Sequence, residues 1–321
     1  MKSTGVGDMI LATPVVRDIV AAFPGAEVVL FAGPDNRDIA ALVEGVRVVE
    51  LQTARPRATL PRLRRERLDA LLDFGQWARL EALYCALSAS RWTGGFQTPG
   101  QRRHFPYDAT AEHSDRVPEL DNFRALARLL GVESRSEPAF DAVPEAVEPP
   151  AADPYVVFHL WPGGFRSDLR EWPAESWREL AGRLADAGYS IVLTGGPGDT
   201  ERTDGFLATC GEHADRLVSV AGRYRLSELV PVLARARAVV SVNTGVMHLA
   251  AAAGAPTIAL NGPTSATRWG PVGANVVSVD SELPGCGYLN LGFEYDGQRT
   301  DCMLGISVDR VAAAVVERAR G

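Results

Sequence analysis

Cysteine is scarce in this sequence, with four residues in a chain of 321. No two of them form a Cys-x-x-Cys pair, so the sequence lacks both the ligand spacing of a zinc site and a disulfide framework. We therefore expect no metal site, and four reduced thiols of the kind usual in a cytoplasmic protein. The four are Cys85, Cys210, Cys286 and Cys302.

Long apolar runs are absent as well. No stretch approaches the roughly 18 apolar residues that a membrane-crossing helix needs. Residues 1–5 lack the apolar segment of a secretory signal. The sequence therefore predicts a cytoplasmic protein without a transmembrane segment, for which contact with the inner membrane would be peripheral.

Basic charge is not in excess, because 33 Lys and Arg stand against 40 Asp and Glu, giving a net charge of −7. A chain of this charge is not expected to bind nucleic acid. The Gly-x-Gly-x-x-Gly fingerprint of a dinucleotide site and the Gly-x4-Gly-Lys-Ser/Thr phosphate loop are also missing. Both absences argue against a dehydrogenase and against a nucleoside triphosphatase.

One clear break in composition is present, at residues 136–154, where five prolines occur without apolar periodicity. This linker predicts two domains, 1–150 and 151–321. Short β-rich runs alternate with helical patterns in both, which is typical of α/β domains with parallel sheets. Helices are expected over 14–23, 62–68 and 175–186, and Ser227 is expected to cap another.

The most informative segment follows an apolar run that ends at residue 242. We expect a tight turn at Asn243, a helix beginning near Thr244 and a stop at Gly254. The unpaired N–H groups and the dipole of such a helix attract an anion, and Gly245 allows it to approach closely. His248 lies one turn further on the same face. The alternative is that Asn243 and Thr244 are ordinary caps and His248 is a half-buried core residue.

Three more turns follow predicted strands of the second domain. Because the carboxyl ends of parallel strands meet at one edge, all four turns should form one site. A nucleoside diphosphate held without a lysine-centred phosphate loop fits this pattern. Arg170 could pair with a phosphate and Asp199 could accept a ribose hydroxyl, although a surface arginine and a solvated turn aspartate are the plainer alternatives. The other residues of these turns are Gly163, Gly164, Gly196 and Thr264.

The first domain offers a Gly7-Asp8 turn before its first predicted helix. Thr13 would cap that helix and Pro14 would be its first residue. Asp8 would then lie at the ligand edge of the domain, where a carboxylate can accept a proton from a hydroxyl. A role of Asp8 as a simple turn residue is the alternative.

Taken together, these segments resemble glycosyltransferase family 9, the ADP-heptose:lipopolysaccharide heptosyltransferases. The resemblance implies an α/β GT-B fold, in which two Rossmann-like domains face each other across a cleft. It also implies inverting, metal-independent sugar transfer from a nucleotide diphosphate donor, with no separate cofactor. The motifs that carry it are Gly7-Asp8 with Pro14, Arg170 to Pro173, Gly195-Gly196-Pro197, Asn243-Thr244-Gly245 with His248, Gly262-Pro263-Thr264, Trp269-Gly270-Pro271 and Cys302-Met303.

The resemblance also implies residue roles. Asp8 matches the proposed catalytic base, while Thr244, Gly245 and His248 match the diphosphate site. Asp199 matches a nucleotide-side acid. Two departures stand out: Arg170 replaces a usual lysine, and Asn243 replaces a usual aspartate near the donor sugar. In addition, only residues 1–4 precede the Gly-x-Gly-Asp turn where the family has a strand, which leaves open whether a central strand is missing.

The expected function is therefore transfer of heptose, from an ADP-linked donor, to a glycan or lipopolysaccharide core. Two alternatives stay open: a GT-B transferase acting on a small-molecule natural product, and a non-catalytic sugar-nucleotide-binding protein. An anionic acceptor would suit an arginine-rich stretch in the first domain, although a solvated basic helix face is the plainer interpretation. These arginines are Arg55, Arg57, Arg62, Arg64, Arg65 and Arg67, with Arg102 and Arg103 further on.

Overall fold

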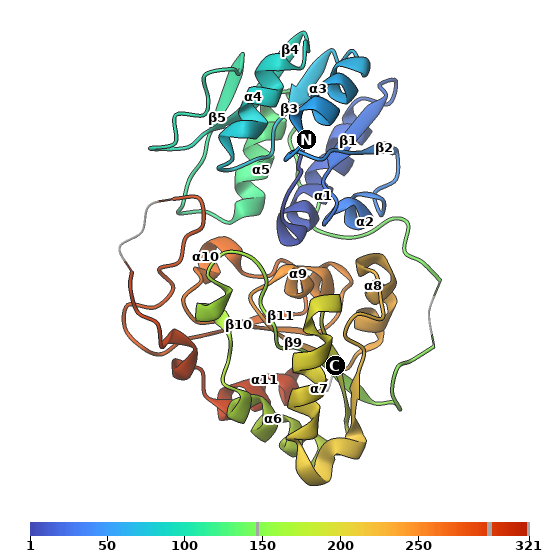
Figure 1. The fold of residues 1–321 in the computed structure, drawn as a ribbon, viewed down its shortest axis with the longest axis vertical. Coiled ribbons are helices and arrows are strands. Elements are labelled where there is room, and N and C mark those ends of the chain that lie inside the picture. Colours follow the sequence, from blue (N-terminus) through green and yellow to red (C-terminus); the bar gives the residue numbers. More distant parts are fainter. Residues whose placement is uncertain (146–147, 294–296, 320–321) are drawn as a thin grey trace. The chain divides into compact units, whose positions relative to one another are not determined.

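The computed structural model describes residues 1–145, 148–293 and 297–319 (Figure 1). The chain divides into two compact units. Unit 1 consists of Met1–Ala142 together with a short segment that begins at Leu291. Unit 2 consists of Val143–Asn290 and the C-terminal part of the chain. Each unit is an α/β structure with parallel strands.

Unit 2 contains a six-stranded sheet in the order β11-β10-β9-β6-β7-β8, and every neighbouring pair is parallel. This is the strand order of a Rossmann fold, with its reversal between β6 and β9. The strands are apolar because both faces of the sheet are covered, so β6, β7, β9 and β10 are buried along their whole length. Their bounds are β6 (Tyr155–His159), β7 (Ser190–Thr194), β8 (Leu217–Ser219), β9 (Ala238–Val242), β10 (Thr257–Asn261) and β11 (Val276–Asp280).

The helices of unit 2 cover this sheet. The core includes Phe158 of β6 with Trp172 and Trp177, whose rings are 5.0 Å apart. Burial of each such side chain contributes about 1.5–3 kcal/mol. The helices are α6 (Ala174–Asp186), α7 (Thr200–Ala208), α8 (Leu226–Arg235), α9 (Gly245–Ala252), α10 (Ala266–Trp269) and α11 (Val308–Ala319), with 3-10 helices η1 (Ser167–Arg170), η2 (Pro197–Asp199), η3 (Gly211–Arg216) and η4 (Cys302–Gly305).

Unit 1 contains two smaller parallel sheets, β1-β2 and β3-β4-β5. The first residues of the chain lie between them, since Lys2 N–H donates to Phe31 O of β1 and Phe74 N–H donates to Met1 O. This puts Lys2 and the turn that follows it at the carboxyl edge of the strands. The elements are β1 (Val28–Ala32), β2 (Val46–Glu50), β3 (Ala70–Leu72), β4 (Trp92–Gln97) and β5 (Ala109–Glu112), with α1 (Val6–Ala22), α2 (Arg37–Ala40), α3 (Pro56–Arg65), α4 (Arg79–Leu87) and α5 (Glu119–Arg128).

The first helix begins earlier than the sequence predicts. Helix α1 starts at Val6, so Thr13 and Pro14 lie inside it and the prediction of Thr13 as its cap is wrong. Proline lacks the N–H that would bond the carbonyl four residues back, which here is Ile10 O. The Thr13 hydroxyl donates to that same carbonyl at 2.8 Å. Thr13 thereby compensates for Pro14 and allows the helix to continue.

Other helix boundaries give a mixed result. The predictions for α6 and for the start of α9 are confirmed. The helix predicted over 62–68 is α3 and ends at Arg65, and α8 begins at Leu226, so that Ser227 lies within its first turn and does not cap it. The wrong boundaries occur where a helix includes a residue type that usually marks a helix end, namely Pro14 in α1, Pro61 in α3 and Ser227 in α8.

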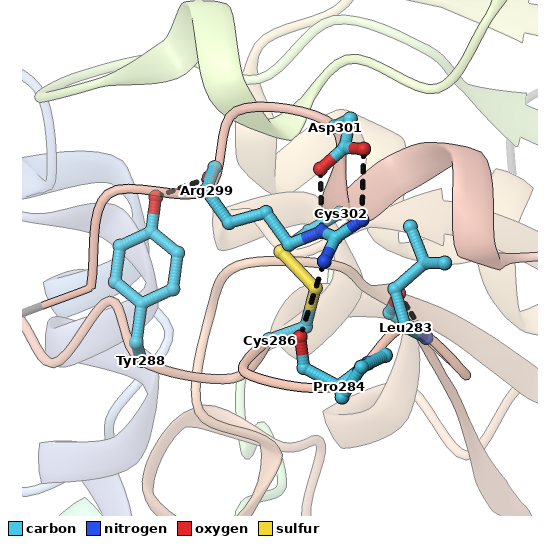
Figure 2. The surroundings of a disulfide bond; sticks show 8 residues. Leu283, Pro284, Cys286, Tyr288, Arg299, Asp301 and Cys302 are labelled. Atoms are coloured by element: carbon cyan, nitrogen blue, oxygen red, sulfur yellow. Dashed lines mark hydrogen bonds and ion pairs between the residues drawn. A yellow bond between two sulfur atoms is a disulfide. The ribbon is translucent and has the colours of Figure 1, made fainter.

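The expectation of four free thiols is wrong for two of the cysteines. Cys286 and Cys302 form a disulfide that joins the segment after β11 to η4, and Arg299 and Asp301 lie beside it (Figure 2). Cys85 is a buried thiol and Cys210 a half-buried one. The pairing of Cys286 with Cys302 was not visible in the sequence, because the two cysteines are 16 positions apart and only the fold of the loop brings them together. Among the described residues, no helix is long and apolar enough to cross a membrane.

Candidate functional site

The four turns singled out in the sequence follow four adjacent strands of unit 2. In the order β10-β9-β6-β7 these strands are parallel, so the turns after them lie along one edge of the sheet. The predicted convergence is confirmed. The loops after β6 and β9 flank the point at which strand order reverses, where open α/β sheets bind their ligands.

The N-terminus of α9 lies at this point. Thr244 is its N-cap residue, in extended conformation, and Gly245 is its first helical residue. Both are half-exposed, and the Thr244 side chain forms no capping hydrogen bond. His248, one turn further on, is only 4% exposed. Main-chain N–H groups in this first turn therefore offer an anion a site with partial positive charge.

Arg170 fastens the two loops at the reversal point to each other. Its Nη1 donates to Asn243 O after β9 at 2.9 Å, and its Nη2 donates to Gly163 O and Phe165 O after β6. The side chain is 6% exposed, and burial lowers the pKa of its guanidinium. Its Nε is buried without a partner among the described residues. Arg170 is thus placed next to α9, but most of its donors hold backbone carbonyls.

The side chain of Asn243 belongs to a buried amide network. Its Nδ2 donates to Asn261 Oδ1 at 2.8 Å and to Trp269 O at 2.9 Å. Asn261 in turn donates from Nδ2 to the Asp280 carboxylate. Because that carboxylate and the Trp269 carbonyl can only accept, the network fixes the orientation of both amides. Position 243 therefore requires a donor, which an aspartate cannot supply.

The remaining predicted residues of unit 2 differ in what they contact. Asp199 Oδ2 accepts a hydrogen bond from the Gly196 N–H at 2.7 Å, and Asp199 Oδ1 forms an ion pair with Arg202 at 2.6 Å. Both carboxylate oxygens therefore already stabilise the turn after β7. Gly163 and Gly164 are exposed in the loop after β6. Thr264 is 3% exposed, and its hydroxyl is buried with no partner among the described residues.

His159 ends β6 beneath this edge and was not predicted as a site residue. Burial lowers the pKa of its imidazole to about 4. The Thr194 hydroxyl donates to Phe158 O, so it accepts from His159 Nδ1 at 3.0 Å. His159 is therefore a neutral donor in the floor of the site at neutral pH.

Asp8 lies in the first turn of α1 in unit 1. Its Oδ2 is 2.9 Å from the Lys2 ammonium, which is 1% exposed. Gly5 permits this arrangement, because it has a φ of 81° and a Cβ there would lie 2.4 Å from Asp8 Oδ2. Gly7 follows in the same turn of the helix. The buried Lys2 ammonium thus fixes the orientation of the Asp8 carboxylate.

Sequence reasoning missed Lys2 and the buried polar chain behind it. Lys2 Nζ donates to Gln76 Oε1, and Gln76 Nε2 donates to Glu119 Oε1 at 3.0 Å. Glu119 lies 3.1 Å from His113 Nε2, with both side chains fully buried. These residues come from separate elements, so no local spacing could identify them. Their signal in the sequence was only that charged residues occur beside predicted strands.

One arginine proposed for an anionic acceptor has a different place. Arg103 is 0% exposed and pairs with Asp73 at 2.7 Å, while also donating to Gly75 O and contacting Tyr107. It is therefore wrong to count Arg103 as a surface cation, because its charge is neutralised inside unit 1. Arg102 and the six arginines from Arg55 to Arg67 differ, since all seven are exposed.

Comparison with known proteins identifies the family. The family model described as glycosyltransferase family 9 (heptosyltransferase) matches residues 119–286, more than half of the chain. This chain belongs to glycosyltransferase family 9. Lipopolysaccharide heptosyltransferase 1 of Pseudomonas aeruginosa is 38% identical over 133 residues, which are 41% of this chain and 36% of that protein. Its counterpart in Salmonella typhimurium is 39% identical over 40% of this chain and 39% of that protein. The matched part thus spans less than two fifths of these curated relatives.

Solved structures extend the likeness in fold over nearly the whole chain. The structure of E. coli ADP-heptose lipopolysaccharide heptosyltransferase II has a TM-score of 0.79 at 22% identity, covering 99% of this chain and 97% of that one. E. coli heptosyltransferase WaaC with ADP has a TM-score of 0.76 at 23% identity, covering 99% and 100%. The predicted α/β GT-B fold of this family 9 chain is confirmed. Among the described residues, no cluster of three or more His, Cys, Asp and Glu could hold a metal ion.

Asn243 gives the first prediction. In Asn243→Asp, a carboxylate would face two acceptors, Trp269 O and Asn261 Oδ1. Both buried hydrogen bonds that the Asn243 amide donates would be lost. We expect unit 2 to lose about 1–3 kcal/mol of stability, measured by urea unfolding with amide exchange of β9 and β10 as the readout. Asp280→Asn is the matched control, because it conserves an acceptor for Asn261. Unchanged stability of Asn243→Asp would contradict the structural role of the amide.

His159 gives the second prediction, which concerns how the stability of unit 2 depends on pH. Its folded pKa of about 4 lies below the unfolded value near 6.5, so the stabilisation is complete above the unfolded value and is lost as the pH falls toward the folded one. Lowering the pH from 7 to 5 should therefore cost unit 2 about 2 kcal/mol through this residue. His159→Asn keeps a donor toward Thr194 and should remove that part of the pH dependence of β6 amide exchange. A variant with the same pH dependence as the wild type would contradict the assignment.

Proposed function

We propose that this family 9 chain transfers heptose from an ADP-linked donor to an acceptor hydroxyl on a lipopolysaccharide core, with inversion at the anomeric carbon. The observation that carries the proposal is the half-exposed N-terminus of α9 at the reversal point of the unit 2 sheet. Its support is the family itself, the similarity to lipopolysaccharide heptosyltransferases, and the likeness in fold to E. coli heptosyltransferase WaaC with ADP. The reaction would take place in the cytoplasm, at the inner membrane.

The donor diphosphate would bind at α9. N–H groups of Gly245 and its neighbours would bond the phosphate oxygens, with the Thr244 hydroxyl and His248 as side-chain donors. Arg170 would act mainly through the loops it holds, with its charge close behind them. As the C1–O bond breaks, the leaving diphosphate takes the electron pair, and these donors stabilise the charge that develops. On this proposal the protein dipoles and cations do the work that a metal ion does in other transferases, and no cofactor is needed.

The acceptor would be activated by Asp8. Its carboxylate would take the proton of the acceptor hydroxyl as that oxygen forms the new bond to C1 on the face opposite the leaving diphosphate. The ion pair with Lys2 fixes Oδ2, which leaves Oδ1 as the oxygen that accepts the proton. Lys2 would therefore be a positioning residue, and Gly5 would be required for the approach of the two charges.

The residues near the donor sugar favour one refinement. Because the Asn243 amide protons are committed to Asn261 and Trp269, this position would contact the sugar through Oδ1 only. Gly163, Gly164 and Thr264 line the same edge and would contact the donor, whereas Asp199 and Gly196 would shape the turn beside the nucleotide. Transfer to a small-molecule acceptor, or binding without transfer, are the outcomes that the following experiments separate from the proposal.

Replacing the base tests the chemistry. Asp8→Asn should lower the turnover of ADP-heptose with a heptose-free lipopolysaccharide acceptor by about 10²-fold or more, because the general base is lost. ADP affinity should be unchanged by calorimetry. Asp35→Asn, at an exposed acid of the same unit, is the matched control. Equal turnover in Asp8→Asn and wild type would remove Asp8 from this role, while ADP binding without any donor turnover would favour the binding protein.

Two substitutions test the diphosphate site. His248→Ala should weaken ADP affinity about tenfold, the usual effect of losing a hydrogen bond to a charged group. His213→Ala, at a half-exposed histidine in η3, should not. Arg170→Lys keeps the charge but cannot bond carbonyls of two loops at once, so it should weaken ADP binding as well. If Arg170→Lys binds ADP as tightly as the wild type, the role of the guanidinium as a clamp is refuted; normal binding by His248→Ala would exclude that imidazole from the site.

A further inference from the structure

The exposed face of α3 and its flanks is rich in arginine. Thr59 and Leu63 are buried on its inward side, and every exposed charged residue of the helix is an arginine. The only acid between residues 55 and 67 is Glu66, which pairs with Arg47. None of the arginines forms an ion pair with another described residue. They are Arg55, Arg57, Arg62, Arg64, Arg65 and Arg67, all exposed in a chain whose net charge is −7.

The neighbouring helix α4 exposes an apolar face. Leu80, Leu83 and Leu87 are 38%, 43% and 39% exposed, and their spacing places them in one row along the helix. Trp77, just before the helix, is 41% exposed. The polar residue Glu81 points the other way and is buried. Since Ala82, Tyr84 and Cys85 are buried as well, α4 carries apolar side chains on both faces, unlike a usual surface helix whose outward face is polar.

The two helices form one surface of unit 1, which Figure 1 shows in blue and cyan. Arg64 Nε donates to Leu87 O at 2.7 Å, so the basic helix meets the end of the leucine row. We refer to the six arginines with Trp77, Leu80, Leu83 and Leu87 as the α3–α4 surface. It combines exposed guanidinium groups that lack a carboxylate partner among the described residues with exposed leucine and tryptophan side chains.

We propose that the α3–α4 surface docks this protein on a bilayer of anionic phospholipids. Guanidinium groups bond lipid phosphates and are attracted to the negative surface, while leucine and tryptophan side chains enter the interface between headgroups and acyl chains. A soluble anionic glycan or a nucleic acid would account for the arginines but not for the leucine row. The docking does not depend on which sugar the protein transfers, so it can be tested without any donor.

The experiment measures sedimentation of the full chain with vesicles. Wild-type protein should bind vesicles of phosphatidylglycerol, release them as ionic strength rises and leave vesicles of phosphatidylcholine largely unbound. The variant Arg57→Gln/Arg62→Gln/Arg65→Gln spares Arg64, which has a structural bond. It should bind phosphatidylglycerol about 100-fold more weakly, since each basic residue near such a surface contributes about fivefold. Arg128→Gln/Arg216→Gln/Arg237→Gln changes net charge equally at exposed positions elsewhere and should bind as the wild type does.

A second pair of variants separates a membrane from a soluble polyanion. Leu80→Gln/Leu83→Gln should bind phosphatidylglycerol vesicles about tenfold or more weakly, whereas Leu304→Gln, at a leucine that is 66% exposed in unit 2, should not change binding. If the arginine variant loses binding and the leucine variant does not, the surface serves a soluble anion and the proposal is overturned. Equal binding by the arginine variant and its control also overturns it. Calorimetry of ADP with each variant reports separately on the nucleotide site.

Discussion

The parallel pairing of β6 with β9 is the constraint on which the candidate site depends. These strands are neighbours in space, although their paired residues, such as Val156 and Ala238, are far apart along the chain and β7 and β8 lie between them in sequence. Their pairing puts the Gly163 loop and the N-terminus of α9 next to each other, and Arg170 then bonds carbonyls of both. Without this register, a glycine turn and a helix end would be two unrelated features.

A buried charge balance organises unit 1 in a comparable way. Lys2 is nearly inaccessible, and a lone ammonium there would be costly, so its pairing with Asp8 and its bond to Gln76 are what make the position tolerable. Asp73, just before Gln76 in the sequence, forms a second buried ion pair with Arg103. These pairs direct specific oxygens at the carboxyl edge of the strands, while the six arginines of the α3–α4 surface are exposed and form no ion pair with a described residue.

Several features of the fold could be predicted because their causes are local. Apolar runs that are buried on both faces gave β6, β7 and β9 their bounds, and the Asn243-Thr244-Gly245 turn marked the start of α9. Predictions failed where a distant or compensating contact decided the outcome. Pro14 is tolerated inside α1 because Thr13 bonds Ile10 O, and Arg103 is buried because Asp73 and Tyr107 meet it there.

The sequence by itself determined the two α/β halves, the family, and the residues that follow each strand, because periodicity and turn chemistry act between near neighbours. Only the tertiary structure decided that Arg170 holds carbonyls, that Asn243 must donate, that Lys2 faces Asp8 and that Cys286 meets Cys302. Each of these depends on which atoms from remote segments share a small volume, and on whether a buried donor or charge finds a partner there. The spacing of residues in the sequence does not show which remote residue will be the partner of a buried donor or charge.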